Sequence, residues 1–223
     1  KHTPNSGPAG GSRSTVMSGN ATRIACENLV KAMKKDDGTY RTYEEMKAEG
    51  IDTHAKGVYT FTASVALNQE TGQGDPFPAY MYAIFLPEVA VDTETGKVKV
   101  EKFTCVTDVG TVMNKSVVDG QFYGGLVQGI GLALTEDFED LEKHTNLLRC
   151  GIPYPMDVPY DLEVIYQESH PRPKSLFGAA GCGEAPLTAP HPAILNAIYN
   201  ATGARITRVP AKPEVVLEAL KEL

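Results

Sequence analysis

A single carboxylate, Glu184, lies in the stretch GAAGCGEAPL, which otherwise consists of small and apolar residues. Burial in surroundings of low polarity raises the pKa of a carboxyl group, because it disfavours the charged form. A glutamate tuned in this way can accept a proton near neutral pH and act as a general base. The alternative is a solvated carboxylate just before a helix, stabilised by the helix dipole. The residue types alone favour this second interpretation.

Cysteine chemistry is another possibility in the same stretch, because Cys182 stands two residues before the glutamate. With His170 or His191 as its base, this thiol could act as a nucleophile. Spacing does not establish such a pair, and an inert small thiol is the favoured interpretation. The chain has four cysteines and no C-x-x-C pair, so the spacings typical of zinc and iron–sulfur sites are absent. We predict that the cysteines are buried or half-buried free thiols.

A loop near the start of the chain, SGPAGGSRST, could bind an anion. Its backbone is rich in Gly and Ser and precedes a predicted helix, so it can present several N–H donors. Arg13 adds a planar guanidinium that suits phosphate oxygens. The loop is not a Walker motif, because no G-K-[ST] follows, and G-x-G-x-x-G after a strand is also absent. A plain flexible loop explains the composition equally well.

The segment DGQFYGGLVQGIG predicts a helix that is unusually rich in glycine. Each glycine costs a helix about 1 kcal/mol relative to alanine, so something must approach this helix closely. Tight packing against another helix is one explanation. A side-chain amide directed at a heterocyclic ligand is the other, since Gln121 and Gln128 are seven residues apart and lie on roughly the same side.

These candidates need a scaffold, and the pattern of apolar residues predicts several helices. The first has Ser18 as its N-cap and Gly38 as its stop. Thr42 and Glu45 form a capping-box pattern for a short helix that ends at Gly50. Further helices are predicted over residues 115–134, 188–203 and 212–223.

Strands are predicted between these helices. The segment GVYTFTA, residues 57–63, has the alternation of a strand, and a β-hairpin is expected over residues 79–107 around TETG. A Pro-rich loop then leads into a strand that ends near residue 167. Because helices and hairpin strands mix without strict βαβ repetition, we expect an α+β layered domain with a mostly antiparallel sheet packed by helices.

Bulk composition limits the function further. The chain has 223 residues, of which 42% are hydrophobic, enough for a substantial core. Its formal net charge is −7 and it has no long basic run, which argues against nucleic-acid binding. No apolar run is long enough to span a bilayer. The chain begins without Met, and we interpret it as part of a longer polypeptide.

Three segments together resemble the molybdenum-binding part of the xanthine oxidase family of molybdenum hydroxylases. They are PNSGPAGGSRSTVMSGNA, VVDGQFYGGLVQGIGLALTE and GCGEAPLTAPHPAILNAI, which occur in the family's order and cover most of the chain in outline. Within the family, the resemblance points to bacterial aldehyde oxidoreductases that carry molybdopterin cytosine dinucleotide. It implies that residues 1–223 are the C-terminal portion of a molybdenum-cofactor-binding domain, either as one unit or as two small α+β subdomains.

The resemblance also implies roles for single residues. Glu184 would be the active-site base beside the metal, accepting a proton from the oxygen that attacks the substrate carbonyl carbon. Gln121 would bond the pterin, and no side chain would bind the metal directly. The loop that would wrap the cofactor consists of Gly10, Gly11, Ser12, Arg13, Ser14 and Thr15. Animal xanthine oxidases carry alanines where this loop has Gly10 and Gly11, so the departure points away from the purine enzymes.

The expected reaction is the hydroxylation of aldehydes to carboxylic acids with water as oxygen source. The alternatives are hydroxylation of a purine- or nicotinate-like heterocycle, a non-catalytic scaffold module, and a hydrolase built on Cys182. The resemblance places 2Fe-2S clusters and the first molybdenum-binding half outside this chain, which should be inactive alone. The expected partners are a small aldehyde, the rest of the polypeptide and an electron acceptor protein. A homodimer in the cytoplasm is also expected.

Overall fold

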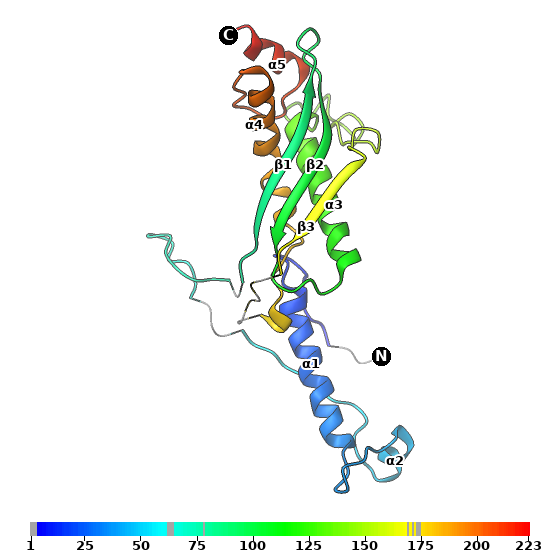
Figure 1. Ribbon diagram of the computed structural model, residues 1–223. Coiled ribbons are helices and arrows are strands. Elements are labelled where there is room, and N and C mark those ends of the chain that lie inside the picture. Colours follow the sequence, from blue (N-terminus) through cyan, green and yellow to red (C-terminus); the bar gives the residue numbers. More distant parts are fainter. Residues whose placement is uncertain (1–3, 62–64, 78, 169, 171, 173–174) are drawn as a thin grey trace. The chain divides into compact units, whose positions relative to one another are not determined.

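The computed structural model describes residues 4–61, 65–77, 79–168, 170, 172 and 175–223 (Figure 1). The chain forms two compact units. The first consists of Lys1–Tyr80 and Pro171–Ala180, and the second of Met81–His170 and Gly181–Leu223. Each unit is described by itself below.

The first unit is built on helix α1, Ser14–Met33. The predicted N-cap, Ser18, is wrong because the helix begins four residues earlier, where the Met17 N–H already bonds the Arg13 carbonyl at 2.9 Å. Local capping preference is a weak signal, and here the buried Val16 and its neighbours extend the helix beyond it. The helix ends at Met33, before the turn that contains Gly38.

The short helix α2, Tyr43–Ala48, follows with its predicted capping box. The Glu45 N–H donates to the Thr42 hydroxyl at 3.2 Å, and the Thr42 N–H donates to the Glu45 carboxylate at 2.7 Å. Gly50 ends this element with a φ of 71°, a conformation that favours glycine. The capping-box prediction is therefore confirmed.

The predicted strand over residues 57–63 is wrong for its described part, residues 57–61, which form no strand. Residues 62–63 lie outside the described residues. The segment packs on α1 instead, because a Cβ at Gly57 would lie 2.0 Å from the Ala21 carbonyl oxygen. The Asn28 side chain also donates to the Lys56 carbonyl oxygen at 3.0 Å. An extended segment on a helix shows the same alternation as a strand, which explains the error.

The second unit contains a three-stranded sheet in the order β1–β2–β3 (Figure 1). The predicted hairpin is confirmed, because β1, Tyr82–Val91, pairs antiparallel with β2, Val98–Asp108. The third strand, β3, Asp161–Tyr166, pairs parallel with β2, so the sheet is mixed. With its helices, this sheet gives the α+β layered fold that the sequence predicts.

Helix α3, Lys115–Leu134, has the predicted bounds, and the Asn114 side chain caps it by accepting from the Val117 N–H at 3.2 Å. A 3₁₀ turn, η2, covers Ala185–Leu187 and leads to α4, Pro190–Thr202. Helix α5, Pro213–Leu220, begins with its proline in the first turn, as predicted. A second 3₁₀ turn, η1, Leu176–Gly178, belongs to the first unit.

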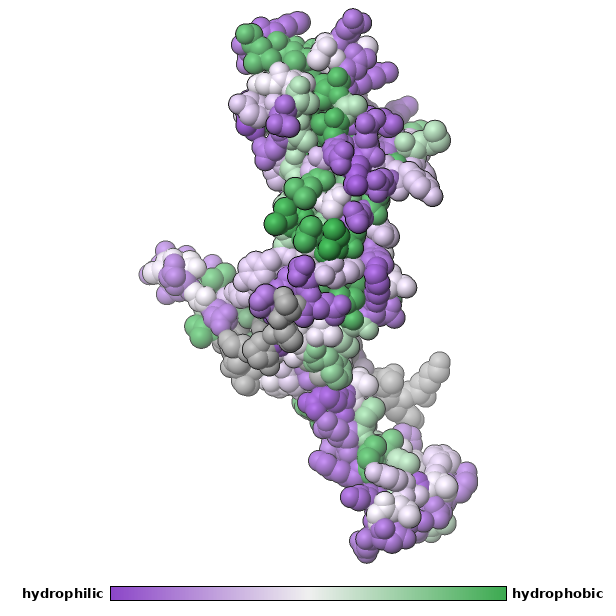
Figure 2. Space-filling view, viewed as in Figure 1, coloured by the Kyte–Doolittle hydropathy of each residue, from purple (hydrophilic) through white to green (hydrophobic). Residues whose placement is uncertain are grey.

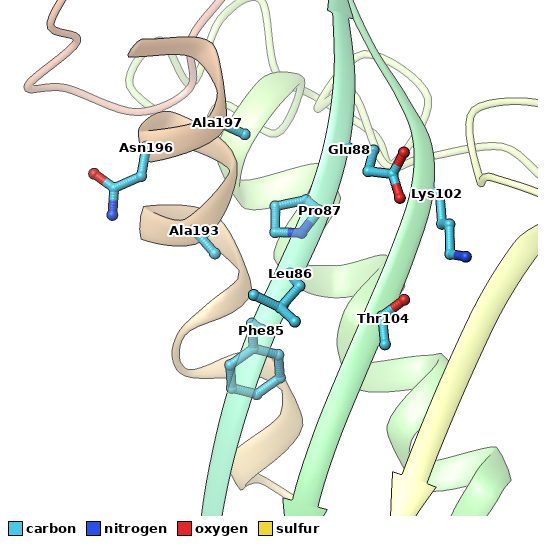
Figure 3. Close-up of a pocket in the computed structure, with 9 residues that line it drawn as sticks. All are labelled: Phe85, Leu86, Pro87, Glu88, Lys102, Thr104, Ala193, Asn196 and Ala197. Carbon is cyan, nitrogen blue, oxygen red and sulfur yellow. The ribbon is translucent and has the colours of Figure 1, made fainter. Parts of the chain in front are cut away.

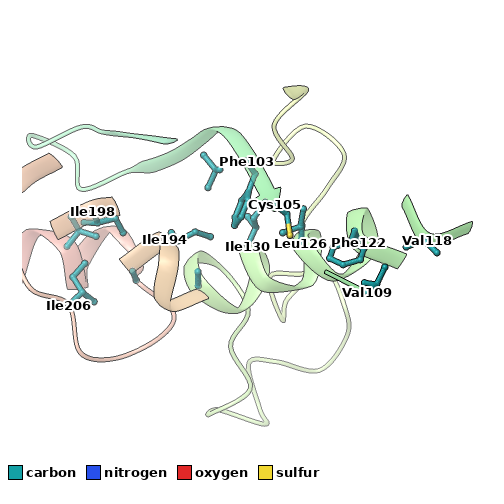
Figure 4. Close-up of a cluster of buried hydrophobic side chains, with 14 residues drawn as sticks. Phe103, Cys105, Val109, Val118, Phe122, Leu126, Ile130, Ile194, Ile198 and Ile206 are labelled. Carbon is teal, nitrogen blue, oxygen red and sulfur yellow. The ribbon is translucent and has the colours of Figure 1, made fainter. Parts of the chain in front are cut away.

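The core of the second unit lies between the sheet and the helices (Figure 4). Alternate residues of β2 point inward, and α3 and α4 contribute one apolar face each. The inward side chains include Phe103, Cys105, Phe122, Leu126, Ile130, Ile194 and Ile198. Their burial fixes the register of β2 and the side of α3 that faces the sheet.

The other face of the sheet is turned toward the viewer in Figure 1, with no helix drawn in front of it. One register row on this face consists of Ile84, Val106 and Ile165. Figure 2 shows an apolar patch over β1, where Ile84 is 61% exposed and Leu86 is 52% exposed. Exposed apolar surfaces of this kind are typical of interaction sites.

Candidate functional site

Glu184 immediately precedes the η2 turn in the second unit, with φ −110° and ψ −24°. Its side chain is exposed in this chain and does not cap the turn. The residue is therefore not enclosed by the described residues, and a dry environment for it would require cover from elsewhere. Within this chain, Glu184 is thus an exposed carboxylate just before a helical turn, as in the second interpretation of the sequence.

The segment after Glu184 is fixed tightly to α3. A Cβ at Gly125 would lie 2.5 Å from the Cβ of Pro186, and a Cβ at Gly129 would lie 2.5 Å from the Cβ of Pro190. Real Cβ atoms are not found so close to other heavy atoms, so both positions require glycine. The prediction that something approaches this helix closely is confirmed. At Gly125 and Gly129 the close neighbours are Pro186 and Pro190, which hold η2 and the start of α4 against α3.

Gln121 is exposed on the same helix. Apart from the helix's own backbone, Cβ atoms built at the neighbouring Gly120 and Gly124 would meet no atom of the described residues within 4 Å. This side of α3 is therefore open within the described chain, whereas the side that carries Gly125 is filled by Pro186. Gln121 lies on α3, and Glu184 directly precedes η2, which packs against α3.

The loop of Gly10, Gly11, Ser12, Arg13, Ser14 and Thr15 lies in the first unit and leads into α1. All of these residues except the half-buried Ser12 are exposed. Gly11 has φ 65° and Ser12 has φ 56°, so a residue with a side chain adopts the left-handed conformation. Such backbone strain is concentrated at ligand-binding and active sites. Arg13 directly precedes the first turn of the helix, where anions bind favourably.

The environment of Cys182 argues against a nucleophile. Burial raises the pKa of its thiol, whereas a reactive cysteine needs a lowered pKa. The structure gives neither candidate base, His170 or His191, a contact with this thiol among the interactions of the described residues. His170 Nδ1 lies 3.4 Å from an Asp108 carboxylate oxygen, and His191 Nδ1 is buried with no hydrogen-bond partner among the described residues. All four cysteines are free, as predicted, and Cys105, Cys150 and Cys182 are buried or half-buried. The predicted burial is wrong for Cys26, which is exposed on α1.

Sequence reasoning missed a polar cluster that joins β3 to α3. The Tyr166 hydroxyl donates to Asp119 Oδ1 at 2.7 Å, and Lys115 Nζ lies 2.8 Å from Asp119 Oδ2. Lys115 Nζ also lies 5.4 Å from the centre of the Tyr166 ring, within the range of a cation–π contact. The i, i+4 spacing of Lys115 and Asp119 was visible in the sequence, but the tyrosine lies 47 residues from the aspartate.

A shallow pocket lies beside β1 and α4 (Figure 3), and none of the predicted site residues lines it. Its lining consists of Phe85, Leu86, Pro87, Glu88, Lys102, Thr104, Ala193, Asn196 and Ala197. Within the described ranges, no group of three or more His, Cys, Asp or Glu side chains is arranged to hold a metal ion. Of the helices in the described part of the chain, none is both long and apolar enough to cross a membrane.

Comparison with known proteins supports one family. The model of the molybdopterin cofactor-binding domain matches residues 1–159. The aldehyde oxidoreductase of Megalodesulfovibrio gigas is 53% identical over 219 residues, which cover 98% of this chain and 24% of that protein. A probable hypoxanthine oxidase of Escherichia coli is 30% identical over 231 residues, covering 95% of this chain and 24% of its own length.

Solved structures give the same result. The aldehyde oxidoreductase from Desulfovibrio gigas matches with a TM-score of 0.95 at 53% identity, over 98% of this chain and 24% of that one. The aldehyde oxidoreductase from Desulfovibrio desulfuricans matches with a TM-score of 0.92 at 56% identity, over 97% of this chain and 24% of that one. The chain thus spans about a quarter of the length of these relatives. It belongs to the molybdopterin cofactor-binding domain family, within the xanthine oxidase family of molybdenum hydroxylases.

Proposed function

We propose that this chain forms part of an enzyme that oxidises aldehydes to carboxylic acids, with water as the oxygen source and Glu184 as the active-site base. The cofactor is molybdopterin cytosine dinucleotide with molybdenum. The 2Fe-2S clusters and the first molybdenum-binding half lie elsewhere in the full enzyme, which passes electrons to an acceptor protein. The proposal rests on 53% identity, over nearly the whole chain, to an aldehyde oxidoreductase.

One structural observation carries the role of Glu184. Its backbone leads directly into Pro186, which packs on Gly125 of the helix that bears Gln121. A base must be held within hydrogen-bonding reach of the group it deprotonates, so a rigid attachment is what this chemistry requires. The close proline–glycine contact supplies that attachment and fixes the glutamate relative to the helix.

The residues present fit a pterin dinucleotide. Apart from their chain neighbours, Cβ atoms at Gly10 and Gly11 would meet no atom of the described residues within 4 Å, which leaves room for a ligand to approach the backbone. The amides that precede α1 suit the anionic and polar edges of such a cofactor. Gln121 offers an amide that both donates and accepts hydrogen bonds. When bound, the cofactor supplies the metal that takes up two electrons from the substrate.

The chain's own residues then have distinct tasks. Gly10–Thr15 and Gln121 bind and orient the cofactor through backbone and amide groups. Glu184 accepts a proton, and its carboxylate needs surroundings with little water to work as a base near neutral pH. Because it is exposed here, the remaining cover must come from the rest of the enzyme or from bound substrate.

Hydroxylation of an N-heterocycle is the second candidate. It is supported by similarity at 30% identity to the probable hypoxanthine oxidase. The higher identity to the aldehyde oxidoreductase favours the aldehyde, as do Gly10 and Gly11 in the loop. A homodimer in the cytoplasm remains part of the proposal, and the four free cysteines agree with a reducing compartment.

The test uses the full-length enzyme. Elemental analysis should find stoichiometric molybdenum, and turnover of an aldehyde in ¹⁸O-labelled water should place the label in the carboxylate. A purine and nicotinate should be oxidised much more slowly. Enzyme without molybdenum, or a carboxylate labelled only from O₂, would overturn the proposal. Faster turnover of the heterocycles would replace the aldehyde with the second candidate.

A further inference from the structure

The hydrogen bond between Tyr166 and Asp119 joins the end of β3 to the part of α3 that carries Gln121. Asp119 lies two residues before Gln121 on α3. Residues two apart on an α-helix point about 200° away from each other around its axis. A bond that holds Asp119 toward the sheet therefore directs Gln121 to the opposite, exposed side of the helix.

The bond adds a polar contact to a part of α3 that has few side chains of its own. Gly120, Gly124 and Gly125 contribute no side chains that could fix how the helix is turned about its axis. On the side that faces the sheet, Val118 and Phe122 are buried in the core. The Phe122 ring also meets the Tyr166 ring edge to face, with 6.1 Å between ring centres, and the Asp119 carboxylate accepts from the tyrosine hydroxyl at 2.7 Å. One tyrosine at the end of β3 thus makes both contacts.

The same tyrosine is connected to the segment that carries Glu184. The Cys182 thiol, two residues before the glutamate, packs against the core and lies close enough to Tyr166 to affect its pKa. Burial and then the bond to Asp119 raise the pKa of Tyr166 far above its usual range. The hydroxyl therefore stays protonated and is a constant donor to Asp119.

We propose that Tyr166 and Asp119 are positioning residues for the cofactor site: their hydrogen bond sets the rotation of α3 so that Gln121 faces the cofactor. The inference rests on the proposed function, in which Gln121 binds the pterin. It assigns no contact with substrate or cofactor to Tyr166 or Asp119. Loss of the bond loosens the part of α3 that precedes Gly125, so that Gln121 spends less time in the binding orientation.

The test measures cofactor retention in the full-length enzyme, as the rate at which molybdenum is lost on extended dialysis. Tyr166→Phe keeps the ring and removes the hydroxyl, and it should lose molybdenum about tenfold faster, the scale of one hydrogen bond to a charged group. Asp119→Asn keeps an acceptor oxygen but not the charge, so its rate of molybdenum loss should lie between those of wild type and Tyr166→Phe. Tyr160→Phe, a change at a fully exposed tyrosine just before β3, is the matched control and should have no effect.

A double-mutant cycle separates positioning from general stability. If Tyr166 acts through Gln121, then Tyr166→Phe with Gln121→Ala loses molybdenum no faster than Gln121→Ala alone. Multiplied losses, or wild-type retention in Tyr166→Phe, would overturn the inference. If Tyr166→Phe does not fold, Asp119→Leu breaks the same bond from the helix and carries the same test. Absence of molybdenum from the wild-type enzyme would instead reject the proposed function.

Discussion

Pro186 packs directly on Gly125, and a Cβ on that glycine would lie 2.5 Å from the proline Cβ and 3.0 Å from its carbonyl carbon. The second of these atoms is backbone, so the contact cannot be relieved by a change of rotamer. Pro186 is itself buried. This contact therefore fixes the distance between α3 and the segment that begins at Glu184.

This contact makes adjacent glycines respond in opposite ways. Gly125→Ala should destabilise the chain by about 1–3 kcal/mol, because the added methyl overpacks against the η2 backbone. The methyl of Gly124→Ala meets no atom of the described residues within 4 Å outside the helix backbone, and the change should stabilise the chain by up to about 1 kcal/mol through helix propensity. Urea unfolding followed by circular dichroism measures both. Equal effects of the two substitutions would contradict the packing described here.

The four cysteines should differ sharply in reactivity. Cys26 is exposed on α1, whereas Cys105 is buried and its burial raises the pKa of the thiol to about 12. Since the thiolate is the reactive form, a disulfide reagent at mildly alkaline pH should label Cys26 rapidly and Cys105 only after unfolding. Cys26→Ser should abolish the rapid phase. A rapid phase that survives this substitution would show that another thiol is accessible.

Asp137 should make stability depend on pH. The Glu139 N–H and then the Lys212 ammonium donate to it, and these contacts hold its pKa below the ordinary value of 3.8. A carboxylate with a lowered folded-state pKa stabilises the fold above its unfolded pKa, and this contribution is lost as pH falls through the folded value.

Asp137→Asn should therefore lower the urea midpoint at neutral pH and flatten the decline of that midpoint below about pH 4. Glu142→Gln removes a charge at an exposed position of the same loop and is the control. It should leave the pH profile close to that of the wild type. If the urea midpoint of Asp137→Asn falls with pH as steeply as that of the wild type, other carboxylates cause the pH dependence of stability.

Local patterns were sufficient for much of the fold. The hairpin, the bounds of α3 and the capping box of α2 follow from alternation, periodicity and short-range hydrogen bonds, all of which lie within a few residues. The start of α1 did not follow, since a good capping residue at Ser18 competes with a helix that gains burial by starting earlier. Residues 57–61 alternate like a strand but lie on α1.

The site shows the same limit. Glycine content revealed that something approaches α3, but not that Gly125 and Gly129 face prolines while Gly120 and Gly124 face open space. That distinction depends on prolines about 60 residues away in the chain. The Tyr166–Asp119 bond likewise joins residues that are 47 positions apart. Glu184 was found through its unusual neighbours and a family resemblance, whereas its exposure in this chain required the structure.

The central claim is that Glu184 acts as the base, and Glu184→Gln in the full-length enzyme tests it most directly. The amide keeps the size of the side chain and cannot accept the proton. We predict that molybdenum content stays at the wild-type level while aldehyde turnover falls by at least about 10³-fold, within the range that general bases contribute. Turnover within about tenfold of wild type, at full molybdenum content, would contradict the account.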